Sequence, residues 1–142
     1  MPDIHHSLQI AAPPAKIAEL AGTAAGFQQW WAADVETLEN GAVSLGFFNR
    51  TTIYQLHLLE KSAERIAWRC ESGHEWQGTD LVFVLTPQEK TVLLDFRHAN
   101  WHAETPYFVS CNTTWGGLMF RLKNAAEGRG SEPLFQKSAM AY

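Results

Sequence analysis

Apolar and polar residues alternate at the start of the chain, before the pattern changes to a helical period. Over residues 4–10, every second position falls on a face that carries Ile, His, Leu and Ile, which predicts a strand with one buried face. Pro13 and Pro14 end this strand and suit the first turn of a helix, where the missing N–H costs nothing. Apolar residues at helical spacing then predict a short helix that Gly22 ends. A connector over residues 23–31 follows, with room for one further helical turn.

Beyond the connector the helical period disappears, and alternation of period two returns in several successive segments. These segments are short and are separated by turn signals such as Asn40-Gly41 and Ser72-Gly73. Successive strands joined by short turns are typical of an antiparallel meander rather than of parallel strands with helical crossovers. The predicted strands cover residues 43–47, 54–58, 66–70, 79–85 and 92–98.

The last regular element is predicted to be a long helix over residues 106–127. Thr105 suits its N-cap, Pro106 its first position and Gly128 its end. At 1.5 Å per residue this helix is about 33 Å long, enough to cross a whole small sheet. Glycines at 116 and 117 are costly inside a helix; either the backbone approaches the sheet or a ligand closely there, or tertiary packing tolerates them. Its apolar face comprises Phe108, Cys111, Trp115, Leu118, Met119, Leu122 and Ala126.

Together these elements predict one α+β domain over residues 1–128, in which a curved antiparallel sheet of about six or seven strands wraps around the C-terminal helix. A sheet of this length twists and curls, because each strand carries a right-handed twist. Curling around one helix leaves a space at the concave face, so we expect a mostly apolar internal cavity. Residues 129–142 form a tail that is expected either to be partly flexible or to dock through Leu134 and Phe135.

Composition and charge restrict the class of partner. The 142 residues are 46% apolar and carry a net charge of −4, which suits one globular domain. Lysines and arginines are scattered, so we expect no binding to nucleic acid. The start lacks a signal-peptide pattern, and no apolar stretch approaches the roughly 18 residues that span a bilayer. These features predict no transmembrane segment and a cytoplasmic location. The two cysteines, Cys70 and Cys111, are therefore expected to be reduced.

The order of elements and the placing of several short motifs form a recognisable pattern over residues 3–128. The motifs are Ala12-Pro13-Pro14, Trp30-Trp31, Trp68, Trp76-Gln77-Gly78-Thr79, Thr91 to His98, and Cys111 with Trp115 and Leu122. This pattern resembles the START-like, or SRPBCC, superfamily with its helix-grip fold, and within it the branch named after the activator of a heat-shock-protein ATPase. The superfamily includes lipid and hormone carriers and aromatic cyclases. The resemblance therefore implies a fold that binds a ligand or acts as a cyclase, and it is compatible with association of two copies into a homodimer. No cofactor is expected.

Inward-facing aromatic and polar residues are the candidate ligand contacts. His98 is the strongest single candidate, because by alternation it should point into the cavity, where it could orient a ligand or act as an acid or base. The alternative is a core histidine satisfied by a backbone carbonyl. Trp30 and Trp31 should either lie at the cavity mouth or fasten the connector to the sheet. The predicted ligand-binding set is Trp30, Trp31, Tyr54, Trp68, Phe83, Phe96, His98, Cys111 and Trp115.

Other chemistry finds little support in the sequence. No histidine or acid is placed to activate the thiols, so both cysteines are expected to be inert. His98 and His102 are four residues apart with Glu104 nearby, but they span a strand end and a loop, and no metal site is expected. Asp80 and Asp95 should lie on the exposed face of the sheet. Hydrolase, P-loop and dinucleotide motifs do not occur.

Three functions stay open on the sequence alone. The first is a binding protein for a small apolar or aromatic molecule, with His98 and Tyr54 as polar contacts. The second is a cyclase- or dehydratase-like enzyme with His98 as general base, ranked lower because no acid accompanies that base. The third is a co-chaperone-like interaction module, which only the family resemblance suggests.

Overall fold

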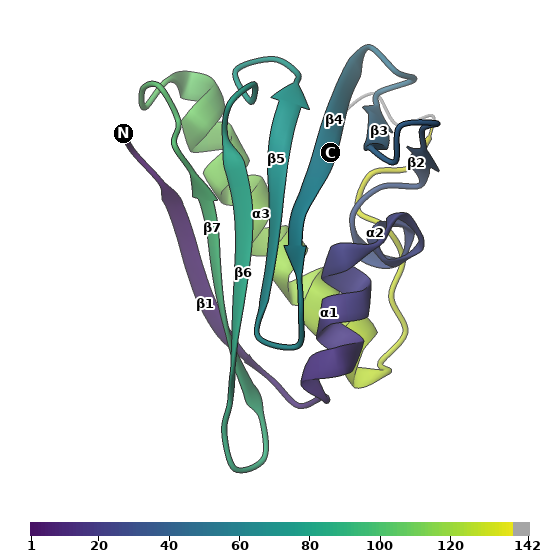
Figure 1. Cartoon of the computed structure of the whole chain (residues 1–142), viewed down its shortest axis with the longest axis vertical. Coiled ribbons are helices and arrows are strands. Elements are labelled where there is room, and N and C mark those ends of the chain that lie inside the picture. The colour runs from purple at the N-terminus through teal and green to yellow at the C-terminus, as the bar shows by residue number, and fades with distance from the viewer. Residues whose placement is uncertain (138–142) are drawn as a thin grey trace.

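The computed structural model describes residues 1–137, so the last five residues of the tail predicted over 129–142 lie outside the described range. The described chain forms a sheet, two short helices and one long helix that runs diagonally behind the strands (Figure 1). In chain order the elements are β1 (Ile4–Ile10), α1 (Pro14–Gly22), α2 (Ala24–Trp30), β2 (Asp34–Thr37), β3 (Val43–Phe47), β4 (Thr52–Lys61), β5 (Arg65–Ser72), β6 (Asp80–Pro87), β7 (Val92–Ala99) and α3 (Pro106–Glu127).

The strands within residues 1–137 form a seven-stranded antiparallel sheet in the order β1-β7-β6-β5-β4-β3-β2. Strands β2 to β7 follow each other in space as they do in the chain, which is the predicted meander. The first strand, β1, joins the edge beside β7, where Ile4 lies opposite His98 and Ile10 opposite Val92. The predicted fold class, a curved antiparallel sheet around a long C-terminal helix, is confirmed.

Strand β2 is the element that the hydrophobic pattern did not predict. It has four residues, two of them exposed, and no apolar alternation marks it. Pairing with β3 places Asp34 opposite Gly46, and a Cβ at Gly46 would lie 2.4 Å from the Asp34 carboxylate. Arg50 then forms an ion pair with Asp34 at 2.7 Å. Tertiary pairing and an ion pair, rather than burial of one face, therefore define this strand.

Helix α3 begins and ends where the sequence predicts. The Thr105 side chain accepts a hydrogen bond from the Phe108 amide at 3.2 Å, and Gly128 closes the helix in the left-handed region with φ 72°. The seven residues predicted for its apolar face are its buried residues. Close backbone approach does not explain the mid-helix glycines, since a Cβ at Gly117 would meet no described atom within 4 Å and one at Gly116 only His6 at 3.6 Å.

Indole N–H groups join the two short helices to each other and α1 to the sheet. Trp30 donates to the carbonyl of Leu20 at 2.9 Å, and Trp68 donates to the carbonyl of Ala21 at 2.8 Å. These acceptors belong to the last turn of α1, where carbonyl groups have no partner inside the helix. Trp68 of β5 thus holds α1 on the sheet, and Trp30 of α2 holds the two short helices together.

The first part of the tail docks on the domain. Leu134 and Phe135 donate backbone hydrogen bonds to the carbonyls of Trp30 and Trp31, at 3.2 and 3.0 Å. Phe135 is buried and belongs to the same hydrophobic core as the sheet and α3. In Figure 1 this yellow segment runs back past α2 towards β2 and β3. A segment close to the C-terminus therefore lies beside the β3–β4 hairpin.

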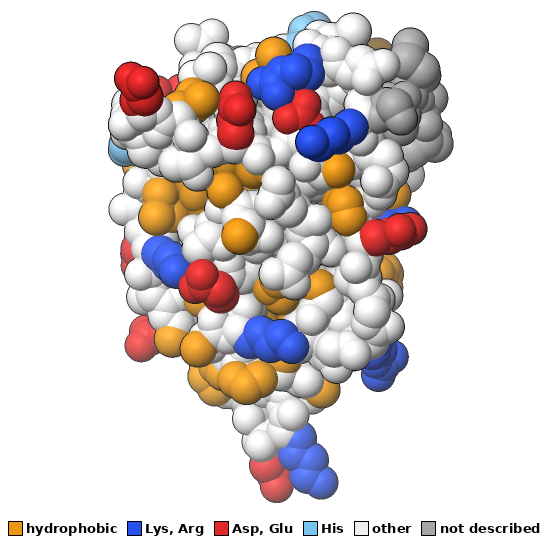
Figure 2. Space-filling view, turned by 90° about the vertical axis from the view of Figure 1, so that its right-hand side faces the viewer, with side chains coloured by type: hydrophobic (Ala, Val, Ile, Leu, Met, Phe, Trp, Pro, Cys, Tyr) orange, Lys and Arg blue, Asp and Glu red, His pale blue; other side chains and the backbone are white. Residues whose placement is uncertain are grey.

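The side of the molecule that faces right in Figure 1 turns toward the viewer in Figure 2. Lysine and arginine side chains lie among aspartates and glutamates on this face, and apolar side chains appear as small separate spots. Surface salt bridges of the molecule include Lys61 with Glu19 at 2.9 Å and Arg65 with Glu60 at 2.6 Å. The charges on this face are mixed rather than gathered by sign.

Candidate functional site

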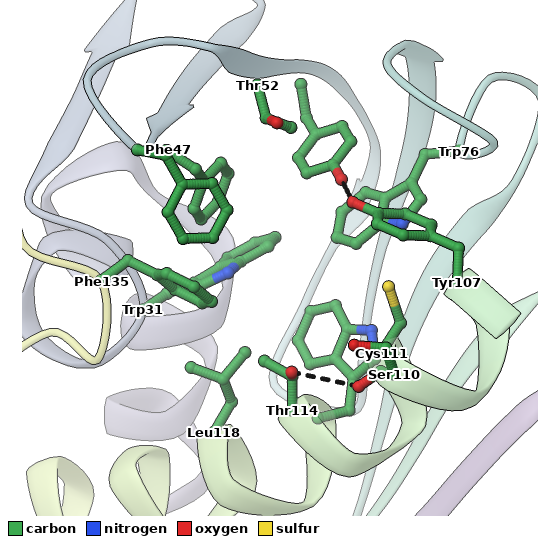
Figure 3. A pocket seen from close by; sticks show the side chains of 13 residues that line it. Trp31, Phe47, Thr52, Trp76, Tyr107, Ser110, Cys111, Thr114, Leu118 and Phe135 are labelled. Atoms are coloured by element: carbon green, nitrogen blue, oxygen red, sulfur yellow. Dashed lines mark hydrogen bonds between the residues drawn. The ribbon is translucent and has the colours of Figure 1, made fainter. Parts of the chain in front are cut away.

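A pocket of about 210 Å³ lies between the N-terminal half of α3, the β3–β4 hairpin and the docked tail. It is therefore at one end of the sheet–helix interface, and Figure 3 shows its side chains converging from these separate segments. Its lining consists of Trp31, Phe47, Phe48, Thr52, Tyr54, Trp76, Tyr107, Ser110, Cys111, Thr114, Trp115, Leu118 and Phe135.

Stacked aromatic rings form one wall of the pocket. The rings of Tyr54 and Trp76 are nearly parallel, with centroids 3.8 Å apart and an interplanar angle of 8°. The ring of Trp115 is also stacked with that of Trp76, with ring centroids 6.0 Å apart. The Tyr54 ring can lie here only because residue 73 is glycine: a Cβ at Gly73 would be 2.1 Å from Cδ1 of Tyr54, and its φ is +131°. The loop between β5 and β6 is thus built around this stack.

The opposite wall combines the β3–β4 hairpin with the tail. Phe135 packs edge to face against Phe47, with ring centroids 4.9 Å apart, and against Phe48 at 5.7 Å. Phe48, Asn49 and Arg50 all have positive φ, between 54° and 67°, which is uncommon for residues with a Cβ. The Asn49 amide donates to the carbonyl of Lys137 at 3.3 Å. The tail therefore supports a turn whose backbone is conformationally costly.

Polar groups are few in the pocket, and none of the described lining residues carries a charged side chain. The hydroxyl groups of Tyr54 and Tyr107 hydrogen-bond across one rim. On α3, the Thr114 hydroxyl donates to the carbonyl of Ser110 at 3.1 Å, as the dashed line in Figure 3 shows. Burial raises the pKa of the Cys111 thiol to about 11, so this group is neutral at physiological pH. The site is apolar, aromatic and uncharged.

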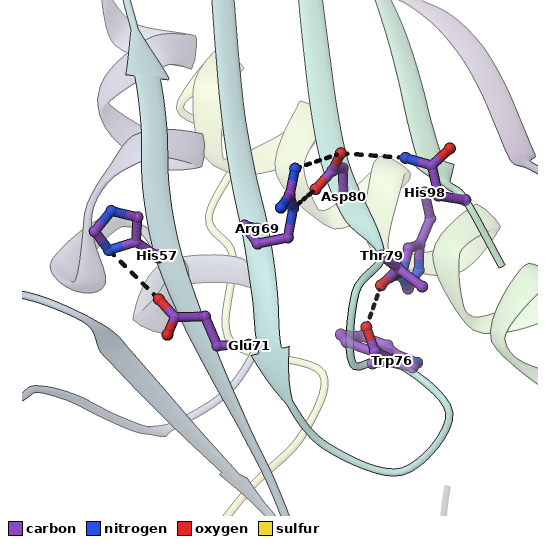
Figure 4. Close-up of polar contacts among 8 residues, drawn as sticks. His57, Arg69, Glu71, Trp76, Thr79, Asp80 and His98 are labelled. Atoms are coloured by element: carbon purple, nitrogen blue, oxygen red, sulfur yellow. Dashed lines mark hydrogen bonds and ion pairs between the residues drawn. The ribbon is translucent and has the colours of Figure 1, made fainter.

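His98 lies in the core beside the pocket rather than in its lining. The Trp115 indole N–H donates to its Nδ1 at 3.0 Å, so the proton of the neutral ring is on Nε2, which donates to the Thr79 hydroxyl at 2.8 Å. That hydroxyl donates in turn to the carbonyl of Trp76 at 2.6 Å, the bond marked between Thr79 and Trp76 in Figure 4. Burial lowers the pKa of His98 to about 3. The ring is neutral, and both of its nitrogens are engaged.

The structure brings four of the nine sequence-predicted site residues to the pocket: Trp31, Tyr54, Cys111 and Trp115. The other five do not line it. Trp30 and Trp68 hold α1 through their indole N–H groups, and His98 orients Trp115. Phe83 and Phe96 pack against each other in the core with centroids 5.0 Å apart. Trp68, Phe83, Phe96 and His98 lie inside the domain, where the alternation of the strands placed them, and Trp30 is buried on α2.

Sequence reasoning missed nine lining residues, and helical spacing could have found four of them. Tyr107, Ser110, Thr114 and Leu118 recur at steps of three and four along α3; Leu118 belongs to the predicted apolar face, and the other three lie beside it. Phe47 ends the predicted strand β3, and Thr52 begins β4. Phe48, Trp76 and Phe135 lie in turns or in the tail, where no periodicity marks a direction.

The outer face of the sheet carries charged pairs rather than a site. Asp80 pairs with Arg69 and accepts from the Asn100 side-chain amide at 3.2 Å, as seen in Figure 4. Asp95 contacts His5 on the neighbouring strand. Within residues 1–137, no group of three or more His, Cys, Asp or Glu residues is arranged to hold a metal ion. No helix in the same range is both long and apolar enough to cross a membrane.

The molecule's architecture matches that of solved proteins with the START-like fold. A START superfamily protein from Mycobacterium smegmatis matches with a TM-score of 0.67 at 13% identity, over 89% of this chain and 98% of that one. DynU16, from the dynemicin biosynthetic locus, matches with a TM-score of 0.75 at 12% identity, over 94% of this chain and 50% of that one. The protein therefore has the START-like helix-grip fold.

The similarity extends to a particular branch of this superfamily. The solution structure of the Aha1 dimer from Colwellia psychrerythraea matches with a TM-score of 0.78 at 26% identity, over 89% of this chain and 97% of that one. This supports the predicted resemblance to the branch of the heat-shock-protein ATPase activator. A scan against protein-family models found no match, and neither did a search of curated protein sequences.

Proposed function

We propose that the protein binds a small, neutral aromatic or apolar molecule in the pocket between the β3–β4 hairpin and α3. The observation that carries this proposal is the lining itself, in which aromatic rings from several segments surround a space without any charged side chain. Aromatic and apolar surfaces with a few placed polar groups are typical of ligand sites. Trp31, Tyr54, Cys111 and Trp115 are the sequence-predicted contacts that this proposal retains.

The volume of the pocket suggests the size of the ligand. A dry engineered cavity of roughly 150 Å³ binds benzene. At about 210 Å³, this pocket suits one substituted aromatic ring or a compact fused pair. A long acyl chain requires more space, so carriage of an extended lipid has less support than binding of a small aromatic compound.

Binding has more support than catalysis at this site. The enzyme hypothesis depends on His98 as general base, yet both nitrogens of that ring are already hydrogen-bonded and its pKa is lowered to about 3. A base with so low a pKa accepts a proton poorly near neutral pH. The lining contains no carboxylate or other histidine to replace it.

The test uses neutral aromatic probes and a pair of matched variants on the same helix. Ser110 lines the pocket, whereas Thr113 is exposed on α3 and does not. Ser110→Trp fills the space, and Thr113→Trp adds the same ring outside it. Titration of acetophenone, followed by tryptophan fluorescence, should show saturable binding to the wild type and to Thr113→Trp. Binding to Ser110→Trp should be at least about tenfold weaker. Equal affinity of the two variants, or no saturable binding of neutral aromatic probes, would refute the proposal.

An interaction function is a second candidate, and the similarity to the Aha1 dimer favours it. In this case the chain associates with a second copy or with a heat-shock-protein ATPase, and the pocket is not required. Light scattering measures the first association, and pull-down with a purified Hsp90-type chaperone measures the second. Unchanged association of Ser110→Trp would separate this role from the pocket.

The cytoplasmic location expected from the sequence stays a prediction, which cell fractionation tests.

A further inference from the structure

We propose that the ligand carries a neutral carbonyl oxygen, which accepts a hydrogen bond from the indole N–H of Trp76. This inference rests on the proposed binding function and adds the chemical class of the ligand: a planar aromatic ketone, aldehyde or quinone. The supporting observation concerns the hydrogen bonds of the buried indole N–H groups. The indoles of Trp30, Trp68 and Trp115 each donate to an acceptor of the protein, at 2.8 to 3.0 Å.

Trp76 differs from these indoles. Trp76 is 4% exposed, yet among residues 1–137 its Nε1 has no nitrogen or oxygen acceptor, and the Cys111 thiol, on which it acts, is only a weak acceptor. An indole N–H only donates, and a buried donor without an acceptor costs free energy, so such groups are rare. The ring cannot turn away easily, because it is stacked on Tyr54 and its backbone carbonyl is held by Thr79. An acceptor supplied from outside the chain would satisfy it.

The surroundings of Trp76 show where that acceptor would lie. Trp76, Tyr107 and Cys111 all line the pocket, and Figure 3 shows them on one side of it. The side chains of Trp76 and Tyr107 both act on the Cys111 thiol as donors, which opposes the effect of burial on the pKa of that thiol. A thiol sulfur is only a weak acceptor. The Tyr107 hydroxyl already pairs with that of Tyr54, so the Trp76 N–H is the donor at this corner that has only the weak thiol acceptor.

Charge decides between a neutral and an anionic acceptor. A carboxylate or phosphate entering this corner would leave water without meeting a cation, because none of the described lining residues is basic. The charge that acts on Cys111 from nearby is the negative charge of Glu75, which repels an anion. A carbonyl oxygen accepts a hydrogen bond without a net charge, and an attached aromatic ring suits the wall formed by Phe47 and Phe135.

The experiment compares two probes that differ mainly in the acceptor. Acetophenone and cumene share a ring and a branched substituent of similar shape, but only acetophenone has a carbonyl. Wild-type protein should bind acetophenone about tenfold more tightly than cumene, the factor that one net hydrogen bond contributes. Benzoate, which carries a charge, should bind more weakly than either. Trp76→Phe should lose the preference for acetophenone while it still binds cumene.

The control is Trp101→Phe. Trp101 is also buried with an unpartnered Nε1 among the described residues, but it does not line the pocket. This variant should keep the preference for acetophenone. A second readout needs no substitution: in nitrogen-15 NMR spectra of the wild type, acetophenone should shift the Trp76 indole N–H resonance downfield, and cumene should not.

The outcomes distinguish this inference from the function on which it rests. Equal binding of acetophenone and cumene, both weakened by Ser110→Trp, would leave the aromatic pocket intact and overturn the carbonyl assignment. An unshifted Trp76 resonance at saturating acetophenone would overturn it as well. Failure of both probes to bind the wild type would instead refute the proposed function itself.

Discussion

Acidification should destabilise this protein through one buried histidine. In the fold, burial lowers the pKa of His98 from 6.5 to about 3, because the charged ring would be surrounded by apolar side chains. At a pH between these two pKa values, His98 is protonated in the unfolded chain but neutral in the folded chain. The stability is therefore complete above about pH 6.5 and decreases as the pH falls towards 3.

The magnitude follows from the same two values. Each pH unit below 6.5 costs about 1.4 kcal/mol until the folded form begins to titrate. At pH 5 the chain should have lost about 2 kcal/mol through His98. Domains of this size are stable by roughly 5–15 kcal/mol, so the effect is a measurable part of the total.

The assay is urea unfolding at pH 7 and pH 5 for the wild type, His98→Gln and His57→Gln. Glutamine at position 98 does not titrate, so this variant should be less stable at pH 7 but should lose about 2 kcal/mol less than the wild type on acidification. His57 lies on the outer face, paired with Glu71 at 3.5 Å and about half exposed, so its variant should follow the wild type. The reasoning fails if His98→Gln keeps the full pH dependence, or if NMR shows the ring protonating near pH 6.5.

Two other predictions concern the loop after β5 and the thiols. Gly73→Ala should destabilise the fold by about 2–4 kcal/mol in thermal unfolding, because the new Cβ would be 2.1 Å from Tyr54 at a φ of +131°. Gly78→Ala, with φ +85° and no neighbour within 4 Å, should cost less; equal losses would rule out the clash as the cause. Burial raises the pKa values of Cys70 and Cys111 to about 12 and 11. Iodoacetamide at pH 8 should therefore label both thiols slowly until urea unfolds the chain, and rapid labelling of native protein would contradict this.

Local patterns predicted the long helix and most of the strands because each has one face against the core. The seven apolar positions of α3, its Thr105 cap and its Gly128 end follow from spacing and from backbone chemistry that neighbouring residues determine. Strand β2 lacks that signal. Its polar residues form a strand because their backbone pairs with the edge of β3 and because Arg50 forms an ion pair with Asp34.

The pocket was harder to predict than the fold, because alternation tells which side chains point inward but not how far inward the space is filled. His98 does point inward, but both of its ring nitrogens are hydrogen-bonded to Trp115 and Thr79, which leaves neither nitrogen for a ligand. Trp76 lies in a turn, where no period gives a direction. Phe135 reaches the pocket from a tail far along the chain from the hairpin it contacts.

The amino-acid sequence by itself determined the order of the elements apart from β2, the apolar side of α3 and the apolar character of the interior. These properties depend on neighbours within a few positions, where steric limits and hydrophobic burial act directly. Tertiary structure alone decided which aromatic residues surround open space and which fill the core. That choice depends on contacts between segments such as the tail, the β3–β4 hairpin and α3, whose separation along the chain leaves no periodic trace in the sequence.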